Sequence, residues 1–249
     1  MNNIFEQQYK VLLMETLLNG SLSNNRTSIK TYKKFNQIIN INLDYGFPII
    51  TGKKIFFDKA LAEFNWIYNG KTDLKFLHDH NIRWWDDFAI NGKLGKVYGY
   101  QIKHFNGIFD QIDYAIKQIK ENSRRAIITL WNPTDLKEQA LPCCYTQFNF
   151  VRDNDKLNMT MHFRSSDLFL GLPYDIIVGS LFLISIAKKC NLNPSILGIN
   201  LADAHVYESH KAQVMAYNKN PIYTLPKITE DFKLVKYKHG PLIKAELVK

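Results

Sequence analysis

Cysteine is scarce in this sequence, and no segment divides the chain. Only three of the 249 residues are cysteine, Cys143, Cys144 and Cys190, and no Cys-x-x-Cys spacing occurs. We therefore expect neither a disulfide scaffold nor a zinc ribbon. No linker rich in proline, glycine or serine interrupts the chain, and 46% of the residues are hydrophobic, enough for one large core. We predict a single domain over residues 1–249.

Long apolar segments are missing as well. Residues 1–8 contain no basic stretch followed by an apolar one, which a secretory leader requires. The longest apolar-rich run, 176–187, is shorter than a membrane-spanning helix. We therefore expect a soluble protein with no membrane partner, located in the cytoplasm, or in the host cytoplasm if the source is viral.

Acidic residues are fewer than basic ones. The 32 lysines and arginines and 23 aspartates and glutamates give a formal net charge of +9. This excess suits nucleic acid, but it suits small anionic ligands such as a nucleotide phosphate equally well. The lysines are scattered and form no long basic run, which is typical of a solvated surface. We expect no DNA partner.

Residue patterns predict a mixture of helices and strands, in the α/β (α+β) class. Apolar spacing predicts helices at 5–19, 57–68, 111–122 and 174–188. Extended runs are predicted at 29–43, 126–131, 145–152 and 157–163, the last two joined by a turn at 153–155. Asp175 is predicted in the first turn of its helix, where the helix dipole favours a carboxylate.

Cys144 is a candidate nucleophile at the entrance of a predicted strand. A cysteine beside a strand is more often an inert core residue, because reactivity needs a low thiol pKa and access to the thiol. Arg164 follows twenty residues later, across the predicted hairpin, where its charge would stabilise a thiolate. This pairing favours a reactive Cys144.

Three segments carry a resemblance to a known family: Leu141-Pro142-Cys143-Cys144-Tyr145, the stretch 164–175, and Asp203-Ala204-His205-Val206-Tyr207. They resemble the nucleophile, the phosphate- and base-reading element and the sugar-binding element of the thymidylate synthase superfamily. Further matches cover nearly the whole chain, at Arg26-Thr27, Gly46-Phe47-Pro48, Glu63-Phe64-Asn65-Trp66, Val97-Tyr98-Gly99, Ser123-Arg124-Arg125 and Trp131-Asn132-Pro133. The resemblance implies a thymidylate synthase-like fold, with a mixed β-sheet packed against helices and one sheet face forming a dimer interface.

The resemblance also implies a chemistry. Cys144, rather than Cys143, keeps the family's spacing and would add to C6 of a pyrimidine nucleotide, which makes C5 nucleophilic. C5 would then take a one-carbon unit from 5,10-methylenetetrahydrofolate, the implied cofactor. Trapping of the exocyclic methylene by hydride gives methyl, and trapping by water gives hydroxymethyl. The implied catalytic residues are Cys144, Glu63, Tyr98 and Asp175.

For Glu63 and Tyr98 we expect particular surroundings or roles. Glu63 stands in an otherwise apolar helix, where an unpaired carboxylate is costly, so we expect it to be hydrogen-bonded to water or to a functional partner. Tyr98 would help to remove the C5 proton through water.

Binding residues are carried over by the same resemblance. The implied phosphate site is Arg26, Arg124, Arg125, Arg164 and Ser165, because guanidinium groups present paired donors to a phosphate. His205 and Tyr207 would bind the sugar 3'-hydroxyl. The implied folate pocket is Trp85, Leu141, Asp167, Gly171, Leu172 and Tyr174. Arg124 and Arg125 would reach into the partner's site, so a homodimer is expected.

Asp175 departs from the family pattern, which has an asparagine that reads uracil. A protonated carboxyl can donate to cytosine N3 and accept from N4, so Asp175 favours a cytosine base. Tyr145 is a second departure, since thymidylate synthases usually have a histidine there in a water network at uracil O4. The resemblance is therefore closest to the deoxycytidylate hydroxymethylase branch, with hydroxymethylation of dCMP as the expected activity.

Other functions stay open or are set aside. Methylation of dUMP, as in thymidylate synthase, and C5 methylation of dCMP or CMP are the alternatives. RNA binding draws only on charge and aromatic residues. A zinc deaminase needs Pro-Cys-x-x-Cys, which is absent, so we expect no metal. The C-terminal stretch 243–249 resembles the family's closing tail but has Glu246 where proline is common.

Overall fold

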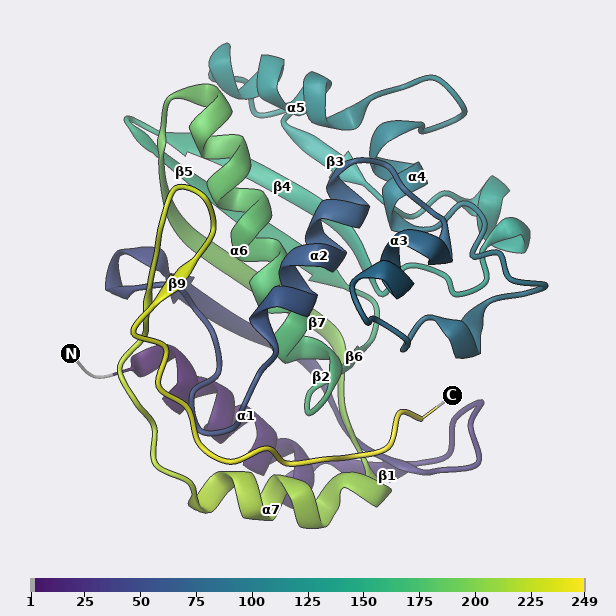
Figure 1. The fold of residues 1–249 in the computed structure, drawn as a ribbon, viewed down its shortest axis with the longest axis vertical. Coiled ribbons are helices and arrows are strands. Elements are labelled where there is room, and N and C mark those ends of the chain that lie inside the picture. The colour runs from purple at the N-terminus through teal and green to yellow at the C-terminus, as the bar shows by residue number, and fades with distance from the viewer. Residues whose placement is uncertain (1–2, 249) are drawn as a thin grey trace.

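A mixed β-sheet is the centre of the fold in the computed structural model, which describes residues 3–248 (Figure 1). The sheet has the strand order β1-β2-β7-β5-β4-β3, and β6 also pairs with β7. β5 and β6 run parallel to β7, whereas the other pairs are antiparallel. The strands are β1 (Ser21–Ser23), β2 (Thr31–Asn42), β3 (Ile127–Thr129), β4 (Tyr145–Asp153), β5 (Lys156–Phe163), β6 (Ser166–Asp167) and β7 (Asn193–Tyr207). A separate hairpin joins β8 (Lys227–Ile228) to β9 (Leu234–Val235).

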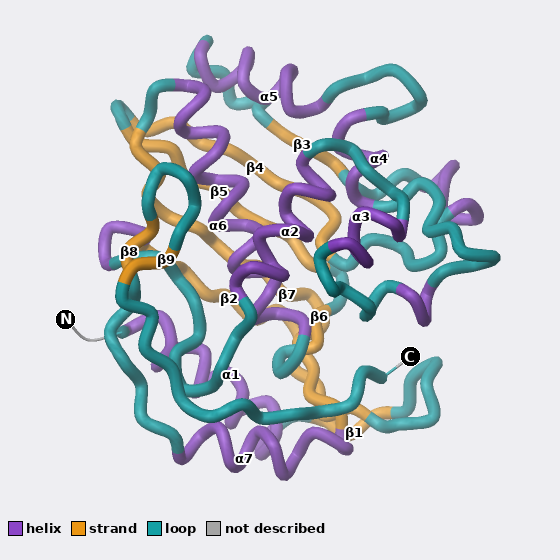
Figure 2. Tube along the Cα trace, in the orientation of Figure 1, coloured by secondary structure: helices purple, strands orange, loops and turns teal. Residues whose placement is uncertain are grey.

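Helices cover one face of this sheet, as Figure 2 shows. The helices are α1 (Ile4–Asn19), α2 (Phe57–Tyr68), α3 (Leu74–Asp79), α4 (Tyr98–Lys103), α5 (Gln111–Lys120), α6 (Gly171–Cys190) and α7 (Lys211–Lys219). Phe182 of α6 packs against Phe64 of α2 and Phe148 of β4, with ring centroids 5.1 and 5.2 Å apart. These three rings join the two central helices to the sheet, as the predicted α/β class requires.

The two faces of the sheet differ in burial. Phe148, Phe150, Met159 and Met161 are fully or almost fully buried under the helices. The alternate residues of β4 and β5 stay partly exposed, as the two-residue period of a strand requires. On β2, which pairs with β7, Phe35 and Ile38 are 82% and 58% exposed. The sheet therefore also has exposed apolar side chains.

The predicted helices and strands are recovered, with one correction at the central helix. α2 matches its predicted range, and α1, α5, β2, β3, β4 and β5 lie within or close to theirs. α6, however, begins at Gly171, so Asp175 lies beyond the first turn, which contains no acidic residue. The expectation that the helix dipole stabilises the Asp175 carboxylate is wrong, because that effect fades within the first turn.

α6 is also longer than the apolar run that predicts it. One helix within residues 3–248, α6, is long and apolar enough by composition to cross a membrane. However, 67% of the relevant stretch is buried inside the protein, against α2, β5 and β7. Its apolar character is that of a core helix.

Glu6 ties the N-terminal helix to distant segments. Its carboxylate is fully buried and accepts hydrogen bonds from the backbone N–H groups of Thr51 (2.8 Å) and Gly52 (2.6 Å). The Tyr217 hydroxyl of α7 (2.7 Å) and the Asn3 amide (2.9 Å) also donate to it. Because all of these donors bind one buried carboxylate, substitution of Glu6 should leave donors unpaired at Asn3, at residues 51–52 and in α7.

Glu6→Gln should lower the free energy of unfolding by about 2 kcal/mol, because the new amide group must face at least one buried donor. Urea unfolding followed by circular dichroism measures this. Glu15→Gln, in the same helix but exposed and paired with Lys34 at 3.0 Å, is the matched control and should leave stability unchanged. Equal stability of the two variants would contradict the role given to Glu6.

Candidate active site

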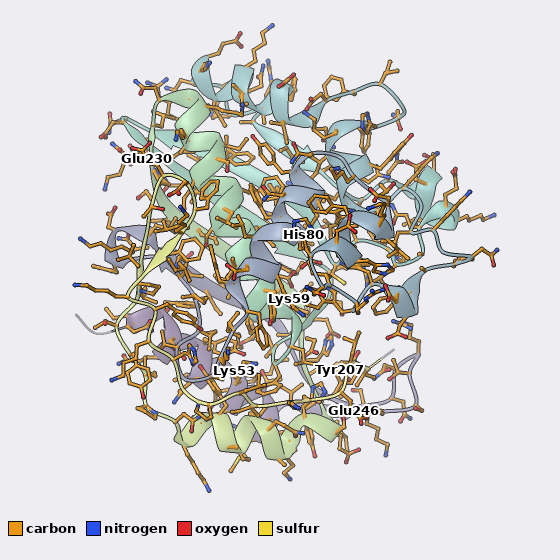
Figure 3. All side chains as sticks on the ribbon, in the orientation of Figure 1. Lys53, Lys59, His80, Tyr207, Glu230 and Glu246 are labelled. Carbon is orange, nitrogen blue, oxygen red and sulfur yellow. The ribbon has the colours of Figure 1, made fainter. Side chains whose placement is uncertain are left out.

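A cavity of about 710 Å³ opens between α2, the start of α6 and the end of β7. Lys59 of α2 and Tyr207 of β7 border it (Figure 3). Most of the residues predicted from the sequence line this one cavity: Arg26, Glu63, Trp85, Tyr98, Leu141, Cys144, Arg164, Ser165, Asp167, Gly171, Tyr174, Asp175, His205 and Tyr207. The fold thus brings together side chains from segments as far apart as residues 26 and 207.

Three predicted residues lie elsewhere. Leu172 is fully buried in the hydrophobic core and does not line the cavity, because it points to the packed side of α6. Arg124 and Arg125 are exposed in the turn after α5, outside the cavity of their own chain. Their predicted contribution to a partner's site stays a prediction.

The Cys144 backbone is fixed from two sides. The hydroxyl of the buried Tyr98 accepts the Cys144 N–H at 2.7 Å, and the Cys144 carbonyl accepts the Arg164 N–H at 2.9 Å. The Arg164 guanidinium donates to the carbonyls of Cys143 (Nε, 3.0 Å) and Pro142 (Nη2, 2.7 Å). The same Nη2 lies 3.8 Å from Cys144 Sγ. The sulfur therefore faces the cavity next to a positive charge.

Two opposing effects set the reactivity of this thiol. Desolvation in the enclosed cavity raises the pKa of Cys144, while Arg164, the Tyr98 hydrogen bond and Arg26 lower it, and Asp175 raises it. The net shift is upward, so the expected stabilisation by Arg164 is present but does not outweigh burial. Cys143 is completely buried, and burial raises the pKa of its thiol strongly. Of the two neighbours, Cys144 has access to the cavity.

Two carboxyl groups face the cavity in different surroundings. Glu63 accepts indole N–H bonds from Trp84 (3.1 Å) and Trp85 (2.6 Å), so the expectation of a hydrogen-bonded Glu63 is confirmed. Burial raises the pKa of Glu63, and the two indole bonds lower it but offset only part of that rise. Desolvation raises the pKa of Asp175 well above the ordinary range, and the charges of Glu63 and Asp167 add to this. Enclosure therefore favours the protonated form of Asp175.

The opposite end of the cavity is basic and polar. His205 Nδ1 lies 2.8 Å from Asp203 Oδ1, and this hydrogen bond lowers the pKa of Asp203. The bond turns the other ring nitrogen of His205 away from Asp203 and fixes the ring orientation. The Tyr207 ring packs edge-on against His205 at 5.2 Å. Arg26, Arg164 and Ser165 line the same cavity and provide donors for an anionic group.

An aromatic wall completes the site, and part of it escapes the sequence patterns. Phe56, Lys59, Trp84, Phe88 and Asp203 line the cavity without having been predicted. Trp84 stands next to the predicted Trp85, and Asp203 belongs to the Asp-x-His-x-Tyr motif, so adjacency is the only signal in the sequence. The tail also contributes Ala245, Leu247 and Val248, and the Glu246 carbonyl accepts from His210 Nε2 at 2.8 Å.

Comparison with known proteins agrees with this geometry. The family model for thymidylate synthase matches residues 7–249, so the chain belongs to the thymidylate synthase family of one-carbon transferases. A thymidylate synthase of Symbiobacterium thermophilum is 36% identical over 262 aligned positions, covering 94% of this chain and 93% of that protein. A thymidylate synthase of Francisella tularensis subsp. holarctica is 34% identical over 259 positions, covering 92% and 94%.

Family membership establishes the general activity. It is a folate-dependent transfer of one carbon to C5 of a pyrimidine nucleotide, and methylenetetrahydrofolate supplies that carbon when bound. The cavity fits both molecules, with cationic and hydroxyl donors at one end and the aromatic wall of Trp84, Trp85, Phe88 and Tyr174 at the other. The mixed sheet packed against helices is likewise the fold of this family.

Iodoacetamide alkylation of the free protein measures how burial and the charge of Arg164 together set the pKa of the Cys144 thiol. Because the pKa of its thiol is raised, the alkylation rate should still increase with pH above about 8.5, the ordinary pKa of a thiol. Arg164→Gln removes the neighbouring charge, so the pKa should rise further and alkylation at about pH 8 should slow roughly tenfold. Peptide mapping distinguishes the three cysteines. Cys190, whose pKa does not depend on Arg164, is the internal control. An unchanged Cys144 rate in Arg164→Gln would contradict the electrostatic role of Arg164.

Proposed function

We propose that this protein hydroxymethylates dCMP at C5, using methylenetetrahydrofolate, through a covalent bond between Cys144 and C6 of the base. The observation that carries the choice of base is the Asp175 carboxyl, which lines the cavity and has its pKa raised well above the ordinary range. A neutral carboxyl at this position offers one O–H donor and one acceptor, the complement of cytosine N3 and N4. Uracil N3–H could also donate to the carbonyl oxygen of this group, but uracil has no basic N3 that can take the carboxyl proton.

The same group supports the chemistry. Addition of the Cys144 thiolate to C6 pushes electrons into the ring, and proton transfer from Asp175 to N3 would neutralise that charge. Arg164, Arg26 and Ser165 would hold the nucleotide phosphate, while His205 and Tyr207 would hold the sugar 3'-hydroxyl. Tyr98 fixes the backbone of the nucleophile by accepting the Cys144 N–H, and its hydroxyl would pass the C5 proton to water.

Methylation of dUMP is the second candidate, and the comparisons favour it. Both relatives described above carry the name thymidylate synthase and align with more than nine-tenths of this chain. The Asp175 carboxyl and Tyr145 in place of the family's histidine support cytosine instead. Tyr145 is almost fully buried between the rings of Tyr98, Phe148 and Phe163, so it offers no network for uracil O4. Hydroxymethyl rather than methyl as the product rests on analogy with cytosine-reading relatives.

Asp175→Asn is the experiment that separates the two candidates. If Asp175 reads cytosine, the wild-type protein should prefer dCMP over dUMP in kcat/KM, on the order of 10²–10⁴-fold, because a wrong base edge leaves enclosed polar groups unpaired. The nearly isosteric Asp175→Asn protein should lose dCMP turnover and gain dUMP binding or C5 hydrogen exchange. Product mass and dihydrofolate release identify the one-carbon group: hydroxymethyl-dCMP without dihydrofolate is expected. A wild-type preference for dUMP, or a preference unchanged by the substitution, would return the assignment to thymidylate synthase.

A homodimer with shared sites is part of the proposal. The sheet face that the helices leave uncovered is the surface that the family uses for association, and it would bring Arg124 and Arg125 of one subunit to the phosphate site of the other. The exposure of both arginines outside their own cavity supports this arrangement.

Mixed dimers test it directly. Cys144→Ala and Arg124→Ala proteins should each be nearly inactive, yet mixing them under conditions of subunit exchange should restore activity, because a hybrid dimer has one site with neither defect. Recovery should approach one quarter of the wild-type rate if subunits mix at random, since half the dimers are hybrids and each has one intact site. No recovery despite exchange, shown by mass spectrometry of labelled subunits, would argue against phosphate binding across the interface.

A further inference from the structure

Two tryptophans hold one oxygen of Glu63. The indole N–H groups of Trp84 and Trp85 both donate to Oε1, at 3.1 and 2.6 Å. Trp85 belongs to the set predicted from the sequence, whereas Trp84 does not. Charge-assisted bonds of this kind strongly favour the ionised form of a carboxyl group.

Trp84 is held in place by its neighbours. Its ring packs against Tyr174 with centroids 5.5 Å apart, and the Lys59 ammonium lies 5.7 Å from the ring centroid on the α2 side. Both contacts use the ring and leave the N–H free for Glu63. A phenylalanine at this position would keep the ring contacts and remove only the donor.

Asp175 lacks such donors. Within residues 3–248, no side chain or backbone N–H donates a hydrogen bond to its carboxyl group, although it lines the same cavity as Glu63. The charge of Glu63 raises the pKa of Asp175, so the two carboxyl groups interact and a second negative charge in the pair is disfavoured.

We infer that Trp84 is a positioning residue that, together with Trp85, keeps the single negative charge of the pair on Glu63 and leaves the proton on Asp175. The indoles thereby decide which of the two enclosed carboxyl groups acts as a hydrogen-bond donor toward the base. The meaning of this arrangement for substrate choice rests on the proposed cytosine-reading role of Asp175.

Other groups around the pair do not provide this asymmetry. Lys59 is on α2 with Glu63, and its ammonium lies over the rings of Phe56 and Trp84. The remaining titratable groups that face the two carboxyls come from α4, β4, β6, α6 and the residue before β4. They are acids with raised pKa values or an additional carboxylate: Tyr98, Cys144, Tyr145, Asp167 and Tyr174. Glu63 alone of the pair receives the two indole bonds.

Carbon-13 NMR of the free protein, labelled at the side-chain carboxyls of Asp and Glu, tests the inference without nucleotide or folate. The Glu63→Gln and Asp175→Asn proteins identify the two resonances. In the wild type, Glu63 should ionise at lower pH than Asp175. In Trp84→Phe, the Glu63 midpoint should move to higher pH and the Asp175 midpoint to lower pH, because the charge is no longer confined to Glu63. A general loss of packing around the site would not shift the two titration midpoints in opposite directions.

The matched control is Trp66→Phe. Trp66 packs against Trp85 with ring centroids 5.6 Å apart, but its indole donates to the Asp73 carbonyl rather than to Glu63. It should leave both midpoints in place. Unmoved midpoints in Trp84→Phe, movement of both in the same direction, or an equal effect of Trp66→Phe would each overturn the inference.

Substrate binding gives an independent reading. Trp84→Phe should weaken dCMP binding about tenfold. The loss should be greatest at high pH, because Asp175 of the variant loses its proton at a lower pH than Asp175 of the wild type. A wild-type preference for dUMP would overturn the proposed function while the midpoints could still move in opposite directions. Opposite movement with unchanged dCMP affinity would overturn the link between the indoles and the base but keep the charge assignment.

Discussion

The chemistry of the cavity depends on the contacts that the Arg164 guanidinium makes with the segment around Cys144. It bonds to the carbonyls of Pro142 and Cys143 and lies beside the Cys144 sulfur, so one side chain fixes the backbone before β4 and places charge at the thiol. Because Arg164 directly follows β5, the β4–β5 hairpin sets the distance between the two residues. A shift of register in this hairpin would separate charge and sulfur at once.

A second support lies beneath the start of α6. Asp167 Oδ1 accepts the N–H groups of Phe169 (2.9 Å) and Leu170 (3.3 Å), which turns the chain into the helix. Lys53, labelled in Figure 3, donates to the Phe169 carbonyl at 2.5 Å and lies 3.7 Å from the centre of its ring. Burial lowers the pKa of Lys53 to about 7, so this amine contributes a hydrogen bond without a permanent charge. The turn that leads into α6, the helix that carries Asp175, is thus fixed by two side chains outside α6.

The sequence alone predicts elements whose stability is local. α2 is recovered because Phe57, Phe64 and Ile67 recur at helical spacing and the helix closes before Gly70. The sequence does not predict β7, the longest strand, because Pro194, Gly198 and Asn200 break its apolar alternation. This strand is stabilised by pairing with β2 on one side and β5 on the other. The site follows the same division. Motif residues are recognisable by spacing, whereas the contact of Trp84 with Glu63 depends on α2 lying beside the loop after α3.

Enclosure raises the pKa values of two groups in the cavity, with opposite consequences for the proposed chemistry. The same desolvation raises the pKa of Cys144, which holds back the nucleophile, and the pKa of Asp175, which preserves a proton donor. In the family's asparagine, donor and acceptor are fixed by the amide, but in aspartic acid the donor exists only while the site keeps the carboxyl neutral. The proposed recognition of cytosine by Asp175 therefore depends less on the carboxyl itself than on the low polarity around it and on the neighbouring Glu63, whose charge raises the pKa of Asp175.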